Sequence, residues 1–132
     1  MSAKNSKNVA KYLDSGSISL FAGQIHETLG NVESIAIQNM DGAIAWTDDT
    51  SSAAADWVVN PFKREKVPGA GFCDRLANDN LGYVFYLHTS SDEDPIASLT
   101  VQIAAANPVS FEQIHASIEP IIECIERQID IN

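Results

Sequence analysis

The chain has 132 residues, 45% hydrophobic and 20% charged, which is the length and composition of one globular domain. It carries 18 acidic residues against 8 basic ones, for a formal net charge of −10. Such a surface repels phosphate backbones and anionic lipids, so we expect no nucleic-acid and no membrane partner. No run approaches the ~20 apolar residues of a membrane span, and the first residues lack a signal peptide.

Two cysteines, Cys73 and Cys124, form no C-x-x-C pair. This usage fits a reducing compartment, and we expect the protein in the cytoplasm.

The chain begins with polar residues, and we expect 1–8 to be flexible. Apolar residues at 9, 12 and 13 suggest a short helix that "DSG" would interrupt. A longer helix follows at about 17–29, with Ser17 as its N-cap and Gly30 as its C-terminal stop. Its apolar residues recur at helical spacing: Ile18, Phe21, Ile25 and Leu29.

The stretch "NVESIAIQNMDGAIAWTDD" predicts a β-hairpin, because apolar residues alternate with small or polar ones around Asp41-Gly42. Residues 49–71 are irregular and contain Pro61 and Pro68, so they predict a long crossing segment. Three further strand patterns follow: "GFCDRLA", "GYVFYLHT" and "IASLTVQIAA". In the predicted hairpin, the apolar residues of the alternating pattern are Ile35, Ile37, Ile44 and Trp46.

The order of these elements predicts an α+β fold. Strands joined by short turns make a single curved antiparallel sheet of about five strands, with the N- and C-terminal helices gathered on one face.

The last segment, "SFEQIHASIEPIIECIERQIDIN", predicts a helix. Ser110 and Gln113 suit a capping box, and Pro120 predicts a kink or a brief break. The stripe continues beyond Pro120 for longer than a five-stranded sheet should cover. We therefore expect 120–132 to be a connector or dimerisation helix, with a seam formed by Ile118, Ile121, Ile125 and Ile129.

No motif for catalysis or phosphate binding occurs, and His26, His88 and His115 lack metal-ligand spacing. The acidic stretches at 48–49 and 92–94 lack the oxygen ladder of a calcium loop and suggest solvated turns. We therefore expect no enzyme and no metal, and the residues identify no cofactor.

The sheet face away from the helices is expected to carry small or polar residues. The crossing segment brings Trp57 and Phe62 over that face, and a cleft between them would suit a small polar ligand. The alternative is a crossing segment that packs down with no room left. The cleft would be lined by Trp57, Phe62, Tyr86, His88 and Thr100. The expected face residues are Ala36, Gln38, Ala43, Ala45, Thr47, Tyr86, His88, Ser98, Thr100 and Gln102.

The whole pattern, from "SIAIQNMDGAIAW" through "LGYVFYLHT" and "IASLTVQI" to the closing helix, resembles the GAF/PAS group of sensor domains. It is most similar to the GAF-like region of bacterial cyclic di-GMP signalling proteins with GGDEF or EAL output domains. There a helix has roughly the pattern "L-x-P-x-L-E-C-L-x-R". The matching residues here are Ile118, Pro120, Ile122, Glu123, Cys124, Ile125 and Arg127.

The resemblance implies one GAF-like domain over 1–132 that senses or regulates without catalysis, forms a homodimer, and works with an output domain, linked or separate. The resemblance implies a role but identifies no ligand, since neither the N-K-x-F-D-E motif of nucleotide-binding relatives nor a bilin-attachment cysteine is present. Two alternatives remain open. One is an interaction scaffold of roadblock or profilin type, and the other is a small enzyme whose groups converge only in the fold.

Overall fold

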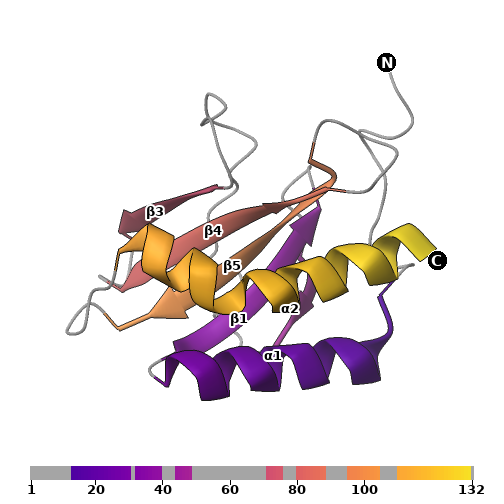
Figure 1. Cartoon of the computed structure of the whole chain (residues 1–132), viewed down its shortest axis with the longest axis horizontal. Coiled ribbons are helices and arrows are strands. Elements are labelled where there is room, and N and C mark those ends of the chain that lie inside the picture. Colours follow the sequence, from indigo (N-terminus) through magenta and orange to yellow (C-terminus); the bar gives the residue numbers. More distant parts are fainter. Residues whose placement is uncertain are drawn as a thin grey trace.

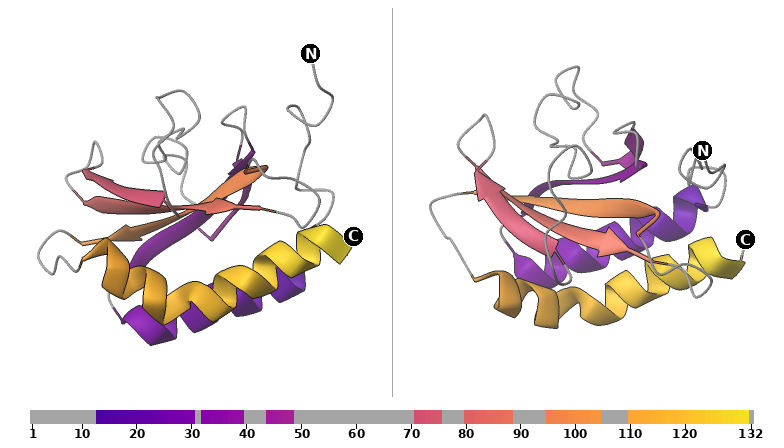
Figure 2. Two further views of the ribbon diagram at one scale, coloured as in Figure 1. Left: turned by 45° about the horizontal axis from the view of Figure 1, so that its top comes forward. Right: turned by 90° about the horizontal axis from the view of Figure 1, so that it is seen from above.

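The computed structural model describes residues 13–30, 32–39, 44–48, 71–75, 80–88, 95–104 and 110–131. Within them, two helices lie on one face of one five-stranded antiparallel sheet (Figures 1 and 2). This confirms the predicted α+β architecture. The predicted flexible residues 1–8, residues 9–12 of the predicted short helix, the Asp41-Gly42 turn and the acidic stretch at 92–94 lie outside the described residues.

The sheet has the strand order β2-β1-β5-β4-β3, with every neighbouring pair antiparallel. The two longest ladders join the central strand β5 to β1 and to β4. The strands are β1 (Val32–Asn39), β2 (Ile44–Thr47), β3 (Gly71–Arg75), β4 (Leu81–Leu87) and β5 (Ala97–Ile103).

The hairpin strands β1 and β2 contain a register shift that simple alternation misses. Ile37 pairs with Trp46, but Gln38 pairs with Ile44, so Ala45 is an extra residue in β2. Residues that pair directly share a face of the sheet. Ile44 therefore lies on the same face as Gln38, and Ala45 packs against the core. The expectation that Ala45 belongs to the helix-free face is wrong for this reason.

Helix α1 (Ser15–Leu29) begins two residues before the predicted start. Asp14, not Ser17, is its N-cap, and the Asp14 carboxylate accepts a 3.0 Å bond from the backbone N–H of Ser17 and a 2.7 Å bond from its hydroxyl. These bonds lower the pKa of Asp14. Gly30 ends the helix with φ 77°, as predicted.

Helix α2 (Phe111–Ile131) runs through Pro120 without a break. The ring removes the bond to the carbonyl of Ala116, but both residues are exposed, so water can satisfy that carbonyl. The predicted cap is present in part, since the Ser110 hydroxyl accepts a 3.2 Å bond from the N–H of Gln113. No helix in the described part of the chain is both long and apolar enough to cross a bilayer.

The isoleucine stripe of α2 is buried by the chain itself. Ile118, Ile125 and Ile129 are at most 3% exposed, and Ile121 is half-buried against the same core. Helix α1 lies alongside α2 and widens the surface on which α2 packs (Figure 1). At the far end, the backbone N–H of Asp14 donates a 2.9 Å bond to Oε1 of Gln128. The inference that α2 outruns its support is therefore wrong, and three of the four seam residues are unavailable to a second copy.

Candidate functional site

The helix-free face of β5 carries a row of three polar side chains. Ser98, Thr100 and Gln102 alternate with Leu99 and Val101, which point into the core beneath the helices. Ser98 and Thr100 have no exposed surface, and Gln102 is only 4% exposed. Each of these groups lost its water on folding and needs a replacement partner.

At one end of the row, Gln102 is satisfied by the protein. Its Oε1 accepts a 2.9 Å bond from Nδ2 of Asn80, and its Nε2 donates a 2.5 Å bond to Oγ of Ser34. The amide thus ties β1 to the residue before β4 across the central strand. This end is a closed hydrogen-bond chain with a structural role.

At the other end, the hydroxyls of Ser98 and Thr100 find no hydrogen-bond partner in the part of the chain that the structure describes. A buried polar group without a partner costs about 1–3 kcal/mol. Two such groups stand two residues apart on one strand. A site for a small molecule is one place where such a cost is tolerated, because the bound molecule provides the missing partner.

Small side chains flank Thr100. Its neighbours across the sheet are Ala36 of β1 and Val84 of β4, while Ser98 lies between Gln38 and Tyr86. The register therefore places two of the predicted site residues, Tyr86 and Thr100, on one face. Trp57 and Phe62 lie outside the described residues, so their part in the predicted cleft stays a prediction.

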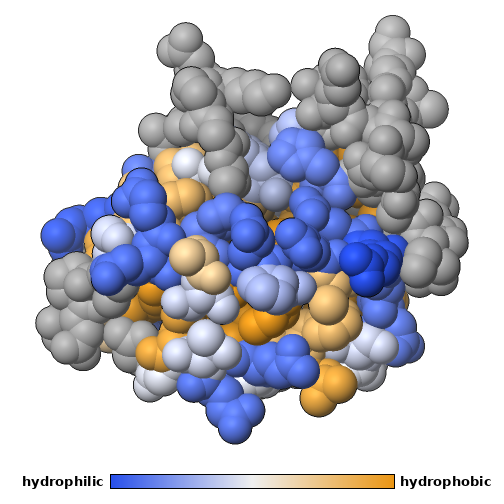
Figure 3. Space-filling model, viewed as in Figure 1, coloured by the Kyte–Doolittle hydropathy of each residue, from blue (hydrophilic) through white to orange (hydrophobic). Residues whose placement is uncertain are grey.

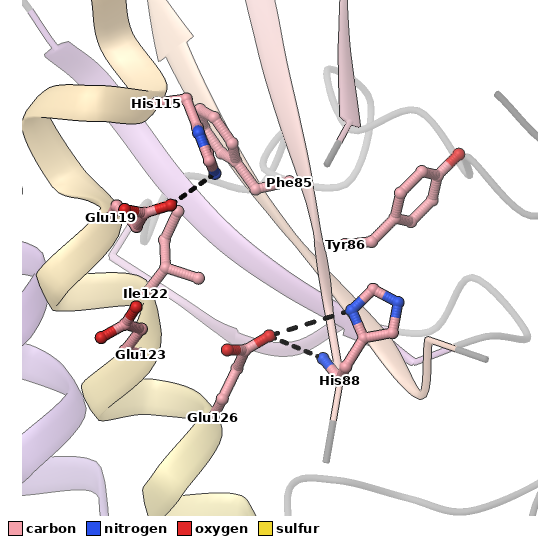
Figure 4. Close-up of a pocket in the computed structure, with 8 residues that line it drawn as sticks. All are labelled: Phe85, Tyr86, His88, His115, Glu119, Ile122, Glu123 and Glu126. Atoms are coloured by element: carbon pink, nitrogen blue, oxygen red, sulfur yellow. Dashed lines mark hydrogen bonds and ion pairs between the residues drawn. The ribbon is translucent and has the colours of Figure 1, made fainter. Parts of the chain in front are cut away.

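His88 is joined to α2 and not to the row on β5. It follows the last residue of β4, and its backbone N–H donates a 2.8 Å bond to Oε2 of Glu126. Its Nδ1 lies 4.0 Å from the same oxygen (Figure 4). Among the described residues, no hydrogen bond joins His88 to the hydroxyl of Thr100.

A groove of about 240 Å³ lies between α2 and β4 (Figure 4). At one end His115 stacks on Phe85 with ring centroids 5.8 Å apart, and its Nε2 lies 3.8 Å from Oε2 of Glu119. Burial raises the pKa of Glu126 at the other end, although the His88 N–H opposes the shift. The groove is lined by Phe85, Tyr86, His88, His115, Glu119, Ile122, Glu123 and Glu126. No sequence motif signals it, because His88 and Glu126 are far apart in the chain.

A second histidine pair fastens α1 to the sheet. His26 Nε2 lies 2.7 Å from Oδ2 of Asp48, whose Oδ1 accepts a 2.8 Å bond from the N–H of Ile35. The carboxylate thus bridges the helix and β1. The prediction of a solvated turn at Asp48 is wrong, and this pair has a structural role.

Among the residues that the structure describes, no three His, Cys, Asp or Glu side chains are placed to hold a metal ion. Comparison of the chain with protein-family models, with curated proteins and with solved structures gave no match.

Proposed function

We propose that this chain is a non-enzymatic sensory or regulatory domain of a bacterial signalling system, which holds a small molecule on the helix-free face of its sheet. One observation carries the proposal. The hydroxyls of Ser98 and Thr100 are buried without partners among the described residues, while Gln102, next in the same row, is fully engaged by protein groups.

A ligand that offers one hydrogen-bonding atom to each hydroxyl removes the cost of burying them. Alternate residues of a strand are about 7 Å apart, so the two polar atoms of the ligand should be separated by about that distance. Ala36 and Val84 beside Thr100 have apolar side chains, so they contribute apolar surface to the site. The two hydroxyls then make the specific contacts with the ligand.

The same strands carry the signal. Leu99 and Val101 of β5 and Phe85 of β4 pack beneath the helices, so a ligand that moves these strands also changes the packing of α2. A cytoplasmic location, a homodimer and a linked or separate output domain belong to this proposal. The two exposed free cysteines, Cys73 and Cys124, are compatible with a reducing compartment.

The test is a thermal-shift screen of the whole chain against neutral metabolites, nucleotides and cofactors, repeated with three variants. Thr100→Val keeps the shape of the side chain and removes its hydroxyl, and Ser98→Ala removes the other. Thr28→Val makes the same chemical change at an exposed position of α1. A hit should raise the melting temperature of the wild type and of Thr28→Val, by linkage. The rise should shrink at least by half in Thr100→Val and in Ser98→Ala.

A ligand that stabilises all four proteins equally would overturn this site. A role as a roadblock- or profilin-type scaffold without a ligand would then be preferred.

A further inference from the structure

The groove lies between α2 and β4, whereas the ring of Tyr86, which shares a face of the sheet with Ser98, points away from α2 (Figure 4). Its apolar lining comes from Ile122 of α2 and Phe85 of β4. At about 240 Å³ it is smaller than the usual pocket for a drug-sized ligand. It has room for one side chain or a small amine.

Three carboxylates stand along the same groove. Glu119, Glu123 and Glu126 are spaced four and three residues apart, so they share one face of α2. The row is about 10 Å long, at 1.5 Å of rise per residue. Hydrophilic side chains follow the course of α2 across the face shown in Figure 3. The row suits an extended chain lying along the helix better than a single small ion.

The carboxylate of Glu126 can accept further hydrogen bonds from a cation. Its side chain is 25% exposed, and within the described part of the chain only its Oε2 accepts a hydrogen bond, from the N–H of His88. A carboxylate accepts several such bonds, and its charge is disfavoured where it is partly buried. No lysine or arginine lies within ion-pair distance of Glu126 among the described residues, and the nearest basic side-chain atom there is Nδ1 of His88 at 4.0 Å.

We infer that this groove docks a basic segment of a partner protein, with one lysine or arginine side chain inserted between Glu126 and Ile122 and further basic residues along Glu123 and Glu119. The apolar stem of such a side chain packs on Ile122, while its charged end meets the carboxylates. The net charge of −10 attracts the same partner over a longer range.

The experiment measures binding of a fluorescein-labelled pentalysine peptide to the full chain by fluorescence polarisation in low salt. Glu123→Gln with Glu126→Gln removes two charges from the groove, and the new amide oxygen that Glu126→Gln introduces can still accept the His88 bond. Glu27→Gln with Glu33→Gln removes two charges from exposed positions of α1 and β1. We expect the Kd to rise at least fivefold in the groove variant and less than twofold in the control.

Glu119→Gln with Glu123→Gln provides a second test, since both side chains are exposed and the change should not affect folding. Its Kd should rise at least threefold. Equal losses in the groove variants and the Glu27/Glu33 control would show unspecific attraction and overturn the inference. Displacement of the peptide by equimolar spermidine would also overturn it, because the groove would then be a polyamine site.

Discussion

Along the central strands β1, β4 and β5, both faces of the sheet are buried, but they differ in how their side chains are satisfied. Beneath the helices, Leu99, Val101 and Phe85 pack in a continuous apolar core that includes the isoleucines of α2. On the other face, Ser98 and Thr100 are as inaccessible as Leu99, at 0% exposure, yet lack hydrogen-bond partners in the described chain.

This difference indicates that the apolar face stabilises the fold, whereas the polar face has side chains that stability alone does not explain. Apolar side chains gain free energy from burial, whereas a buried hydroxyl without a partner loses it. A fold selected only for stability would have valine at position 100, between Ala36 and Val84. Residues that break a local rule without an evident gain are where a functional site is expected.

The largest expected effect comes from the helix-covered face. Ile118→Ala should lower the free energy of unfolding by about 3 kcal/mol, because it leaves a cavity at a fully buried position. Urea denaturation measures the loss. Leu20→Ala is the control, since Leu20 is 62% exposed, and it should change stability by less than about 0.5 kcal/mol. Similar small losses in both variants would contradict the placement of the α2 stripe in the core.

Substitutions on the helix-free face should have opposite effects at the two ends of the row. Gln102→Leu breaks the bonds to Asn80 and Ser34 and should cost about 1–2 kcal/mol. Thr100→Val removes only a hydroxyl without a partner in the described chain, and should leave the ligand-free protein unchanged or up to about 1 kcal/mol more stable. Chemical denaturation of both variants measures the contrast.

A loss of more than about 1 kcal/mol in Thr100→Val would mean that its hydroxyl has a protein partner, and the proposed ligand site would lose its main support. Thr28→Val, on the exposed surface of α1, shows the effect of the same chemical change where the hydroxyl is solvated.

The smallest effect concerns Glu126. Its pKa in the folded chain is raised above the ordinary value of 4.5, so the folded state binds more protons than the unfolded state as pH rises from that value. Stability is therefore highest where the carboxyl is protonated and falls as pH rises through the folded pKa. Glu126→Gln should remove this fall, so unfolding curves of wild type and variant should separate slightly as pH rises from about 4.5. A wild type that gains stability relative to the variant over this range would refute the direction of the shift.

The sequence predicted the strands, both helices and the arrangement of helices on one face, because alternation and helical spacing are local signals. It misassigned the second half of α2, because nothing local shows that α1 lies beside α2 and buries Ile125 and Ile129. It also placed the N-cap at Ser17, since serine and aspartate are both good caps and only the geometry of Asp14 decides between them.

The candidate site could be predicted only in part. Alternation placed Tyr86 and Thr100 on the helix-free face, but it gave the same status to Gln102, which proves to be fully bonded. Whether a hydroxyl has a partner depends on residues distant in the chain. The contact between His88 and Glu126 depends in the same way on how β4 meets α2, and no spacing in the sequence encodes it.

The strand order has a consequence for how the chain reaches its fold. Strand β1 pairs with β5 from Val32 opposite Ile103 to Asn39 opposite Ala97, and Asp14 is bonded to Gln128. The earliest elements thus find their neighbours among the latest. Large loops must close before these contacts form, which places folding among the slower kinetics of non-local topologies. On the ribosome, α1 and β1 must wait until β5 and α2 have emerged, with Ile18 and Ile25 exposed to chaperones in the meantime.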